Sequence, residues 1–277
     1  MLALLASIPS PPDNGISIGP LELRAYGLAI AVGVLVAVEV ARRRWAAQGG
    51  DPEAIGEIAV WAVPAGFVGA RLYHVITDWH RFDDAPLDAF KVWEGGLGIP
   101  GGVLLGTVVG VAVARRKGYD VPRLMDAAAP ALPLAQAIGR LGNWFNQELF
   151  GRPTDLPWGL EIDPEHRPEG YADVETFHPT FLYEALWNVA LAAFLIWLGS
   201  KHRLRAGQLF VLYVAGYGLG RLWVEALRID EATRIAGVRV NIWVSGLTVV
   251  AALAVFAWRR RHRPEVTEDR AEEVEPA

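Results

Sequence analysis

Seven blocks of apolar residues divide this 277-residue chain, and each block is about long enough to cross a lipid bilayer. A spanning helix needs roughly 20 mostly apolar residues, whereas β-barrel strands would be shorter and would alternate polar with apolar positions. That alternation is not evident in the sequence. The pattern therefore predicts an all-α integral membrane protein with seven transmembrane helices. The predicted spans cover residues 23–41, 58–77, 97–114, 124–145, 180–198, 207–227 and 242–258.

Basic clusters follow the first, third, fifth and seventh of these blocks, whereas the other loops are rich in aspartate and glutamate. Lysine and arginine concentrate on the cytoplasmic side of membrane proteins. Four clusters after odd-numbered spans therefore predict one orientation, with the N-terminus outside and the C-terminus in the cytoplasm. Six spans would put some clusters on the wrong side. The clusters are Arg42 to Arg44, Arg115 to Lys117, Lys201 with Arg203 and Arg205, and Arg259 to Arg261 with Arg263.

Two polar stretches belong to a different environment from the spans. Residues 147–179 contain several prolines and predict a small extracytoplasmic cap on a single membrane domain, residues 1–262. Residues 263–277 are charged and lack apolar periodicity, so we expect a disordered cytoplasmic tail. The chain has no cysteine, which excludes disulfides, thiolate metal sites and a cysteine nucleophile within it.

Polar side chains interrupt the apolar pattern near the end of the fourth block, in the sequence GRLGN at residues 139–143. Arg140 and Asn143 are three residues apart and would share one face of a helix. An arginine inside a membrane normally faces a partner or a wet cavity, because its charge is costly in lipid. Snorkelling to the outer interface is the alternative, but it would not need the neighbouring Asn143, Asn146 and Glu148.

The sixth block carries a second polar stripe. Tyr217, Arg221 and Glu225 are four residues apart and would lie on one face of a hydrophobic helix. An Arg221–Glu225 ion pair that joins two helices would explain this stripe without a ligand. Guanidinium groups also bind phosphate through forked hydrogen bonds, and a phospholipid headgroup is the phosphate at that depth. Arg140 and Arg221, on separate helices near the outer leaflet, favour such phosphate binding.

Three other features allow either a structural or a functional interpretation. Gly102, Gly106 and Gly110 recur every four residues and predict a close-packing helix face. The glycine-rich residues 94–102 are poorly suited to an ordinary helix and predict a bent or re-entrant segment. Arg71, near the end of the second block, is either a third functional arginine or a packing residue.

Together these segments resemble the prolipoprotein diacylglyceryl transferase family, and the resemblance extends over residues 8–258. Its strongest part is residues 139–143 followed by Asn146, Glu148, Leu149 and Gly151. The other matching stretches are Leu23 to Gly27, His178-Pro179 with Leu182 to Glu184, and Tyr217-Gly218 with Arg221, Glu225 and Arg228.

The resemblance implies an enzyme of the bacterial cytoplasmic membrane that acts in the first step of lipoprotein maturation. Such an enzyme transfers the diacylglyceryl group of phosphatidylglycerol to the lipobox cysteine of a preprolipoprotein signal peptide. A thioether forms and glycerol 1-phosphate leaves. We expect no cofactor, no metal and no nucleic-acid partner. A transporter and another transferase that uses phosphatidylglycerol are the alternatives, since intramembrane charges also mark transport pathways.

The resemblance also implies roles for individual residues. Catalytic roles fall on Tyr26, Arg140, Asn143, Arg221 and Glu225, and contacts to phosphatidylglycerol fall on Arg140, Asn143, Asn146, Glu148, Gly151 and Arg221. The chemistry of the residues agrees, because the substrate supplies the missing cysteine and arginines can stabilise a leaving phosphate.

One departure from the family leaves the general base open. Many members have a histidine in the glycine-rich loop, whereas this chain has Pro100 there, and glycine and isoleucine replace the usual serine and phenylalanine at residues 98–99. A thiol is mostly protonated at neutral pH and needs a base or a positive field. His74 and Glu148 are candidate bases, and we favour activation by the field alone. The arginines that would supply this field are Arg71, Arg140 and Arg221.

Overall fold

The computed structural model describes residues 7–18, 21–83, 85–92, 95–202 and 204–261, and the predicted tail at residues 263–277 lies outside them. The described part is α-helical, with three small two-stranded antiparallel sheets. The helices are α1 (Ala25–Ala47), α2 (Ala54–Thr77), α3 (Ile99–Arg116), α4 (Val121–Ala128), α5 (Ala131–Phe145), α6 (Thr180–Lys201), α7 (Gln208–Leu227) and α8 (Val240–Arg261).

Short elements connect the helices. The strands are β1 (Gly15–Ile18), β2 (Leu21–Arg24), β3 (Leu160–Glu161), β4 (Thr176–Phe177), β5 (Arg234–Ile235) and β6 (Val238–Arg239), paired in that order. Single 3₁₀ turns lie at η1 (Trp79–Arg81), η2 (Pro86–Phe90) and η4 (Pro164–His166).

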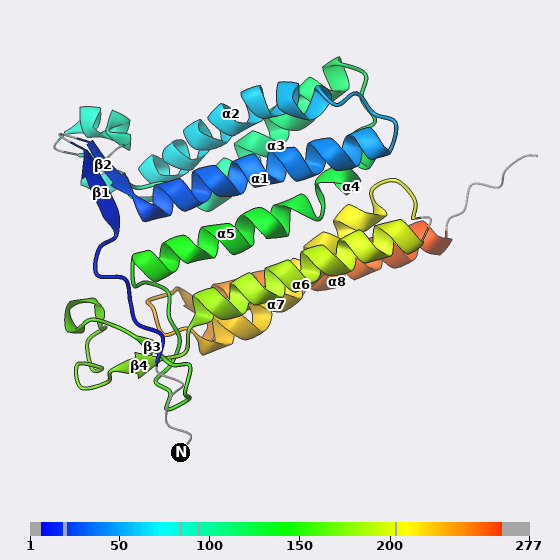
Figure 1. The fold of residues 1–277 in the computed structure, drawn as a ribbon. Coiled ribbons are helices and arrows are strands. Elements are labelled where there is room, and N and C mark those ends of the chain that lie inside the picture. Colours follow the sequence, from blue (N-terminus) through cyan, green and yellow to red (C-terminus); the bar gives the residue numbers. More distant parts are fainter. Residues whose placement is uncertain (1–6, 19–20, 84, 93–94, 203, 262–277) are drawn as a thin grey trace, which may run out of the picture.

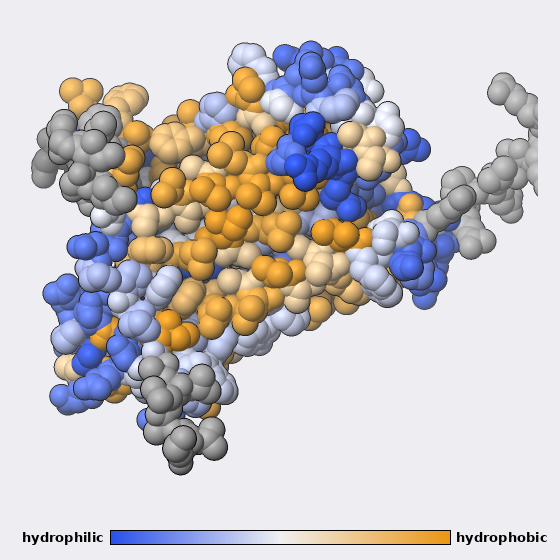
Figure 2. Space-filling view, in the orientation of Figure 1, coloured by the Kyte–Doolittle hydropathy of each residue, from blue (hydrophilic) through white to orange (hydrophobic). Residues whose placement is uncertain are grey.

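Five of the helices, α1, α2, α3, α6 and α8, are long and apolar enough to cross a membrane. The sixth predicted block corresponds to α7, an apolar helix that carries Arg221 and Glu225. Figure 2 shows an apolar belt over the middle of the bundle with hydrophilic surface at both ends. Such a belt suits a bilayer, whereas soluble monomers rarely expose large apolar patches.

The prediction of one continuous helix over residues 124–145 is wrong. The structure has two helices there, α4 and α5, separated at Ala129 and Pro130. Pro130 has no N–H to continue the hydrogen-bond ladder, and its ring clashes with the carbonyl four residues earlier. The chain therefore breaks, and α5 has only 15 residues.

The helices pack side by side along one direction (Figure 1). α1 contacts α2 of the α2–α3 pair on one side and α5 on the other. α5 contacts α6, α6 contacts α7, and α7 contacts α8. The last turns of α1, α3, α6 and α8, which carry the basic clusters, lie together at one end of the bundle. The short strands and the long loop after α5 lie at the opposite end.

The close-packing glycine face is confirmed. Cβ atoms on Gly102 and Gly106 would each lie 3.1 Å from a carbonyl oxygen of α2, and one on Gly110 would lie 3.4 Å from Cβ of Ala62. Gly101, beside this face, is closer still, with its Cβ 2.2 Å from the carbonyl oxygen of Gly69. Only glycine allows α2 and α3 to approach this closely. The irregular part of the glycine-rich segment ends at Gly98, so Gly101 and Gly102 are already helical.

The loop after α5 forms a small cap with its own apolar core at the strand-bearing end. The N-terminal segment crosses to this cap: the Ile8 N–H donates to Gly159 O at 2.8 Å, and the Glu161 N–H donates to Ile8 O at 2.9 Å. Trp144 Nε1 of α5 donates to Pro9 O at 3.1 Å. The core consists of Phe150, Leu160, Ile162, Phe177 and Phe181, and it covers the ends of α5 and α6.

Candidate active site

The end of α5 directs Arg140 and Asn143 into the bundle, on one helix face as predicted. Arg140 Nη1 donates to Asn143 Oδ1 at 3.1 Å. Asn143 Nδ2 in turn donates to Glu148 Oε1 at 2.7 Å, and Asn146 Nδ2 donates to the same oxygen at 3.2 Å. The four polar residues that follow one another along this segment therefore form one connected network.

Glu184 of α6 joins this network to α7. Arg140 Nε lies 2.5 Å from Glu184 Oε2, and Arg221 Nη1 lies 3.0 Å from Glu184 Oε1. The Glu184 side chain is only 7% exposed, whereas both arginine side chains are 17% exposed. Two arginines from different helices thus converge on one buried carboxylate.

Glu225, one turn further along α7, is completely buried and has arginines on both sides. Arg221 Nη2 lies 2.6 Å from its Oε2, an ion-pair distance without hydrogen-bond geometry. Arg239 Nε donates to its Oε1 at 2.7 Å, and Asn241 Nδ2 donates to the same oxygen at 3.2 Å. Arg228 Nη1 lies 3.7 Å away. A buried carboxylate stays ionised only with such partners, so Glu225 anchors the back of Arg221.

The network ends at Asp230, in the turn after α7. Arg228 donates two hydrogen bonds to its carboxylate, at 2.7 and 2.9 Å, and Arg239 Nη2 donates a third at 3.0 Å. Burial alone would raise the pKa of Asp230, but the hydrogen bonds and charges of Arg228 and Arg239 outweigh it, and the pKa falls below 3.8. Asp230 therefore stays ionised and holds both arginines in place.

Exposure separates the arginines into two groups. Arg140 and Arg221 are 17% exposed, while Arg228 and Arg239 are 6% exposed. Arg140 and Arg221 are thus the more accessible pair, and the more buried pair contacts Glu225 behind them. Guanidinium donors such as these suit an anionic ligand.

Tyr26 and Gly142 meet beside this network. A Cβ atom on Gly142 would lie 2.5 Å from Cδ2 of Tyr26, so the tyrosine ring of α1 packs directly on the glycine of α5. Tyr26 also lies within electrostatic reach of Glu148 and Arg140. A side chain at residue 142 would therefore clash with the Tyr26 ring, and only glycine leaves room for it.

Gly151 lies at a junction of backbones. A Cβ atom there would lie 2.8 Å from Cβ of His178 and 3.3 Å from the carbonyl oxygen of Leu227. Its backbone pairs with that of Arg228 in a short antiparallel bridge. Gly151 thus lies where the cap meets the start of α6 and the end of α7, next to Arg228 of the arginine network.

Arg71 does not join Arg140 and Arg221, which corrects the expectation of a field from three arginines. Its guanidinium donates to five carbonyl oxygens of the loop between α2 and α3, at 2.6 to 3.3 Å. These acceptors satisfy its donors and hold the glycine-rich loop in shape. The carbonyls belong to Asp88, Ala89, Lys91, Gly95 and Gly96.

His74 lies with the same loop. Its Nδ1 is 2.9 Å from Asp78 Oδ2, and its ring meets Phe82 edge-on at 6.0 Å. A Cβ atom on Gly96 would lie 2.3 Å from its Nε2. These contacts place His74 in the α2–α3 half of the bundle, whereas Glu148 belongs to the arginine network.

Several members of the network escaped the sequence analysis as site residues. Glu184 entered only through the family resemblance, although a carboxylate inside an apolar helix is itself a signal. Arg239, Asp230 and Asn241 gave no such signal, because they lie in a turn and at the start of α8, where polar residues are ordinary.

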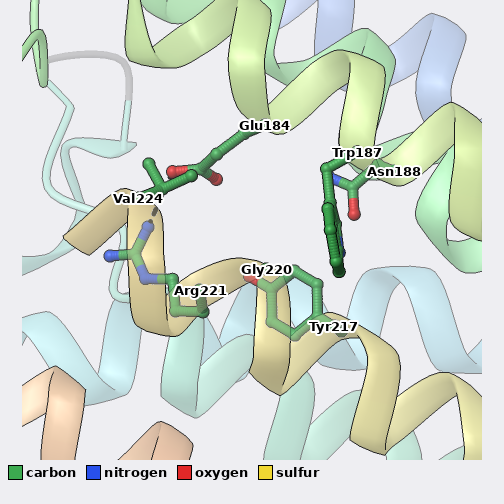
Figure 3. A pocket seen from close by; sticks show the side chains of 7 residues that line it. All are labelled: Glu184, Trp187, Asn188, Tyr217, Gly220, Arg221 and Val224. Carbon is green, nitrogen blue, oxygen red and sulfur yellow. Dashed lines mark hydrogen bonds and ion pairs between the residues drawn. The ribbon is translucent and has the colours of Figure 1, made fainter. Parts of the chain in front are cut away.

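A narrow pocket opens beside the arginine pair, between α6 and α7 (Figure 3). Glu184 and Arg221 form one wall, and Trp187, Asn188 and Tyr217 form the rest with neighbouring apolar groups. Arg221 therefore faces both Arg140 across Glu184 and this pocket.

The fold and the site define a multi-helix membrane protein with a cluster of arginines and buried carboxylates inside the bundle. A family model described as prolipoprotein diacylglyceryl transferase matches residues 14–258. The chain belongs to this family.

Curated relatives agree over nearly the whole chain. A phosphatidylglycerol–prolipoprotein diacylglyceryl transferase of Rhodococcus jostii (strain RHA1) is 50% identical over 96% of the chain and 78% of the relative. The enzyme numbered 2 of Streptomyces coelicolor is 49% identical over 95% of the chain and 84% of its own length. The enzyme of Corynebacterium glutamicum (strain ATCC 13032) is 47% identical over 98% of the chain and 89% of its own length.

Proposed function

We propose that this protein transfers the diacylglyceryl group of phosphatidylglycerol to the lipobox cysteine of preprolipoproteins. The relatives carry this activity in their names, as phosphatidylglycerol–prolipoprotein diacylglyceryl transferases, at 47–50% identity. The observation that carries the proposal is the convergence of Arg140 and Arg221 on Glu184 inside an apolar bundle. Such a site suits a phosphate in a bilayer.

Arg140 and Arg221 hold the phosphodiester through their outward donors. The cysteine sulfur, having lost its proton, attacks the diacylglyceryl carbon that bears the phosphate oxygen. The carbon–sulfur bond forms as the carbon–oxygen bond breaks, and glycerol 1-phosphate leaves with the electron pair. Negative charge grows on the phosphate oxygens during this step, and preoriented guanidinium groups stabilise it.

The remaining site residues position this pair. Asn143 holds Arg140, Glu225 holds Arg221, and Asn146 orients Glu148. Among the candidate bases, Glu148 is favoured over His74, because Glu148 is connected to Arg140 through Asn143. Tyr26, near both Glu148 and Arg140, faces the same region, and Gly151 allows the cap to close behind it.

The protein acts as a seven-span enzyme of the bacterial cytoplasmic membrane. The five long apolar helices, α7 and the α4–α5 pair supply the seven crossings. The N-terminus and the cap lie outside, and the basic ends of α1, α3, α6 and α8 lie in the cytoplasm, as the distribution of arginine favours.

The cysteine-free chain allows this orientation to be tested by labelling single introduced cysteines. A membrane-impermeant maleimide should label Glu165→Cys, in the cap, in intact cells. It should label Ser200→Cys, at the other end of α6, only after lysis. The reverse pattern would contradict the orientation.

The activity is tested with the purified full-length protein, phosphatidylglycerol and a lipobox peptide. Mass spectrometry should detect one diacylglyceryl group on the peptide cysteine, and a peptide with serine at that position should remain unmodified. Absence of this product from a folded preparation would refute the proposal. Phosphatidylglycerol-dependent solute flux in proteoliposomes without peptide modification would indicate a transporter instead.

A further inference from the structure

A buried polar atom without a partner lies in the pocket beside the arginine pair. Asn188 of α6 is 2% exposed, and its Oδ1 has no hydrogen-bond partner among the described residues. Figure 3 shows this oxygen pointing from α6 toward α7, beside the Trp187 ring. A buried carbonyl that accepts no hydrogen bond is costly, so we expect a donor to occupy the space in front of it.

The size and surroundings of the pocket limit this donor. The space between the side chains is about that of one water molecule. It therefore fits a single hydroxyl group, whereas a methylated ammonium group is too large. Arg221 and Glu184 both line the pocket and already pair with each other, so a neutral hydroxyl group suits it better than a further ion.

The position of the pocket relates it to the phosphate site. Asn188 follows Glu184 by four residues, which is one helical turn or about 6 Å along α6. Arg221 lines both sites. A hydroxyl a few bonds beyond a phosphate held by Arg140 and Arg221 can therefore reach Asn188.

We propose that this pocket binds a hydroxyl of the terminal glycerol of phosphatidylglycerol, with Asn188 Oδ1 as its acceptor. This inference rests on the proposed transferase function and adds headgroup selection to it. Asn188 is a specificity residue, since it contacts the group that leaves with the phosphate and not the reacting carbon. A site that hydrogen-bonds a substrate hydroxyl discriminates against an analogue that lacks it.

The test compares phosphatidylglycerol with phosphatidyl-1-propanol of the same acyl chains, which has no headgroup hydroxyl. The reacting carbon and the phosphate are unchanged, so the ratio of the two kcat/KM values reports the headgroup alone. The intact wild-type protein should prefer phosphatidylglycerol by about tenfold or more. Asn188→Leu should bring the ratio close to one, chiefly by lowering kcat/KM for phosphatidylglycerol.

Gln136→Leu provides a matched control. Gln136 also has a buried side-chain oxygen without a partner, and its Nε2 donates to Tyr213 OH at 3.0 Å, but it does not line this pocket. The same change from amide to apolar side chain there should leave the lipid preference at the wild-type ratio.

Three results would overturn the inference. The wild-type protein could use both lipids equally, a result that does not depend on any variant folding. Asn188→Leu could lower both kcat/KM values by the same factor, as expected if the pocket holds only a structural water. Absence of product from both lipids with wild-type protein would refute the transferase function itself, and the headgroup site with it.

Discussion

Glu184→Gln tests the carboxylate that joins Arg140 and Arg221. Glu184 contacts Arg140 at 2.5 Å and Arg221 at 3.0 Å, and its side chain is 7% exposed. Glutamine keeps the size but replaces one accepting oxygen with an NH₂ group that faces a guanidinium. Removing one partner from a buried ion pair costs about 3–5 kcal/mol. Because both arginine side chains are only partly buried, we expect the lower end, about 3 kcal/mol of unfolding free energy.

The same change should lower the transferase rate. Arg140 and Arg221 lose the group that sets their separation, and a misplacement of about 1 Å in an active site can cost roughly 100-fold in rate. Initial rates of diacylglyceryl transfer to a lipobox peptide, together with thermal unfolding of the same preparation, measure both effects.

Glu39→Gln is the control for this substitution. Glu39 also bridges two arginines, Arg42 at 2.7 Å and Arg43 at 2.5 Å, but near the surface of the opposite end of the bundle. Surface ion pairs contribute little, so its rate and unfolding midpoint should stay at the wild-type values. If Glu184→Gln behaved like Glu39→Gln in both assays, the bridging role of Glu184 would be refuted.

Three further predictions follow from packing and charge. Gly142→Ala should abolish most activity, because its Cβ would lie 2.5 Å from an aromatic ring of α1, whereas Gly139→Ala, with its nearest neighbour at 3.5 Å, should remain active. Gly101→Ala should destabilise the protein by about 1–3 kcal/mol through overpacking. Gly110→Ala, whose Cβ would lie 3.4 Å from its nearest neighbouring atom, should be close to wild type in thermal unfolding. Asp230 has a lowered pKa, so its contribution to stability is present above pH 3.8 and is lost as the pH falls further. Asp230→Asn should therefore be less stable than the wild-type protein at neutral pH and should lose less stability on acidification. Equal acid sensitivity of the two proteins would contradict this assignment.

Helix positions could be predicted from the sequence because long apolar blocks have one stable arrangement in a bilayer. The last predicted residue of the sixth block, Leu227, is also the last residue of α7. The break at Pro130 was missed, because the apolar composition continues through it and only the backbone geometry of proline interrupts the helix.

The site residues that could be predicted from the sequence are those that place a charge inside an apolar helix. Arg140, Arg221 and Glu225 stood out for this reason, and the structure brings them together through Glu184. The partners of Arg71 could not be predicted, since they are loop carbonyls whose positions depend on tertiary folding. Arg239 was missed for a related reason, because a polar residue in the short connection between α7 and α8 gives no sign that it will be buried against Glu225.

In the proposed mechanism Arg140 and Arg221 together hold the lipid phosphate. The transfer rates of three arginine variants test this joint role. The rate of diacylglyceryl transfer from phosphatidylglycerol to a lipobox peptide is measured for Arg140→Gln, Arg221→Gln and the surface variant Arg43→Gln. Loss of a donor that stabilises developing charge costs about 100- to 1,000-fold in rate. We predict losses of this size for the first two variants and wild-type rates for the third. Full activity in both Arg140→Gln and Arg221→Gln would show that these two arginines do not hold the phosphate.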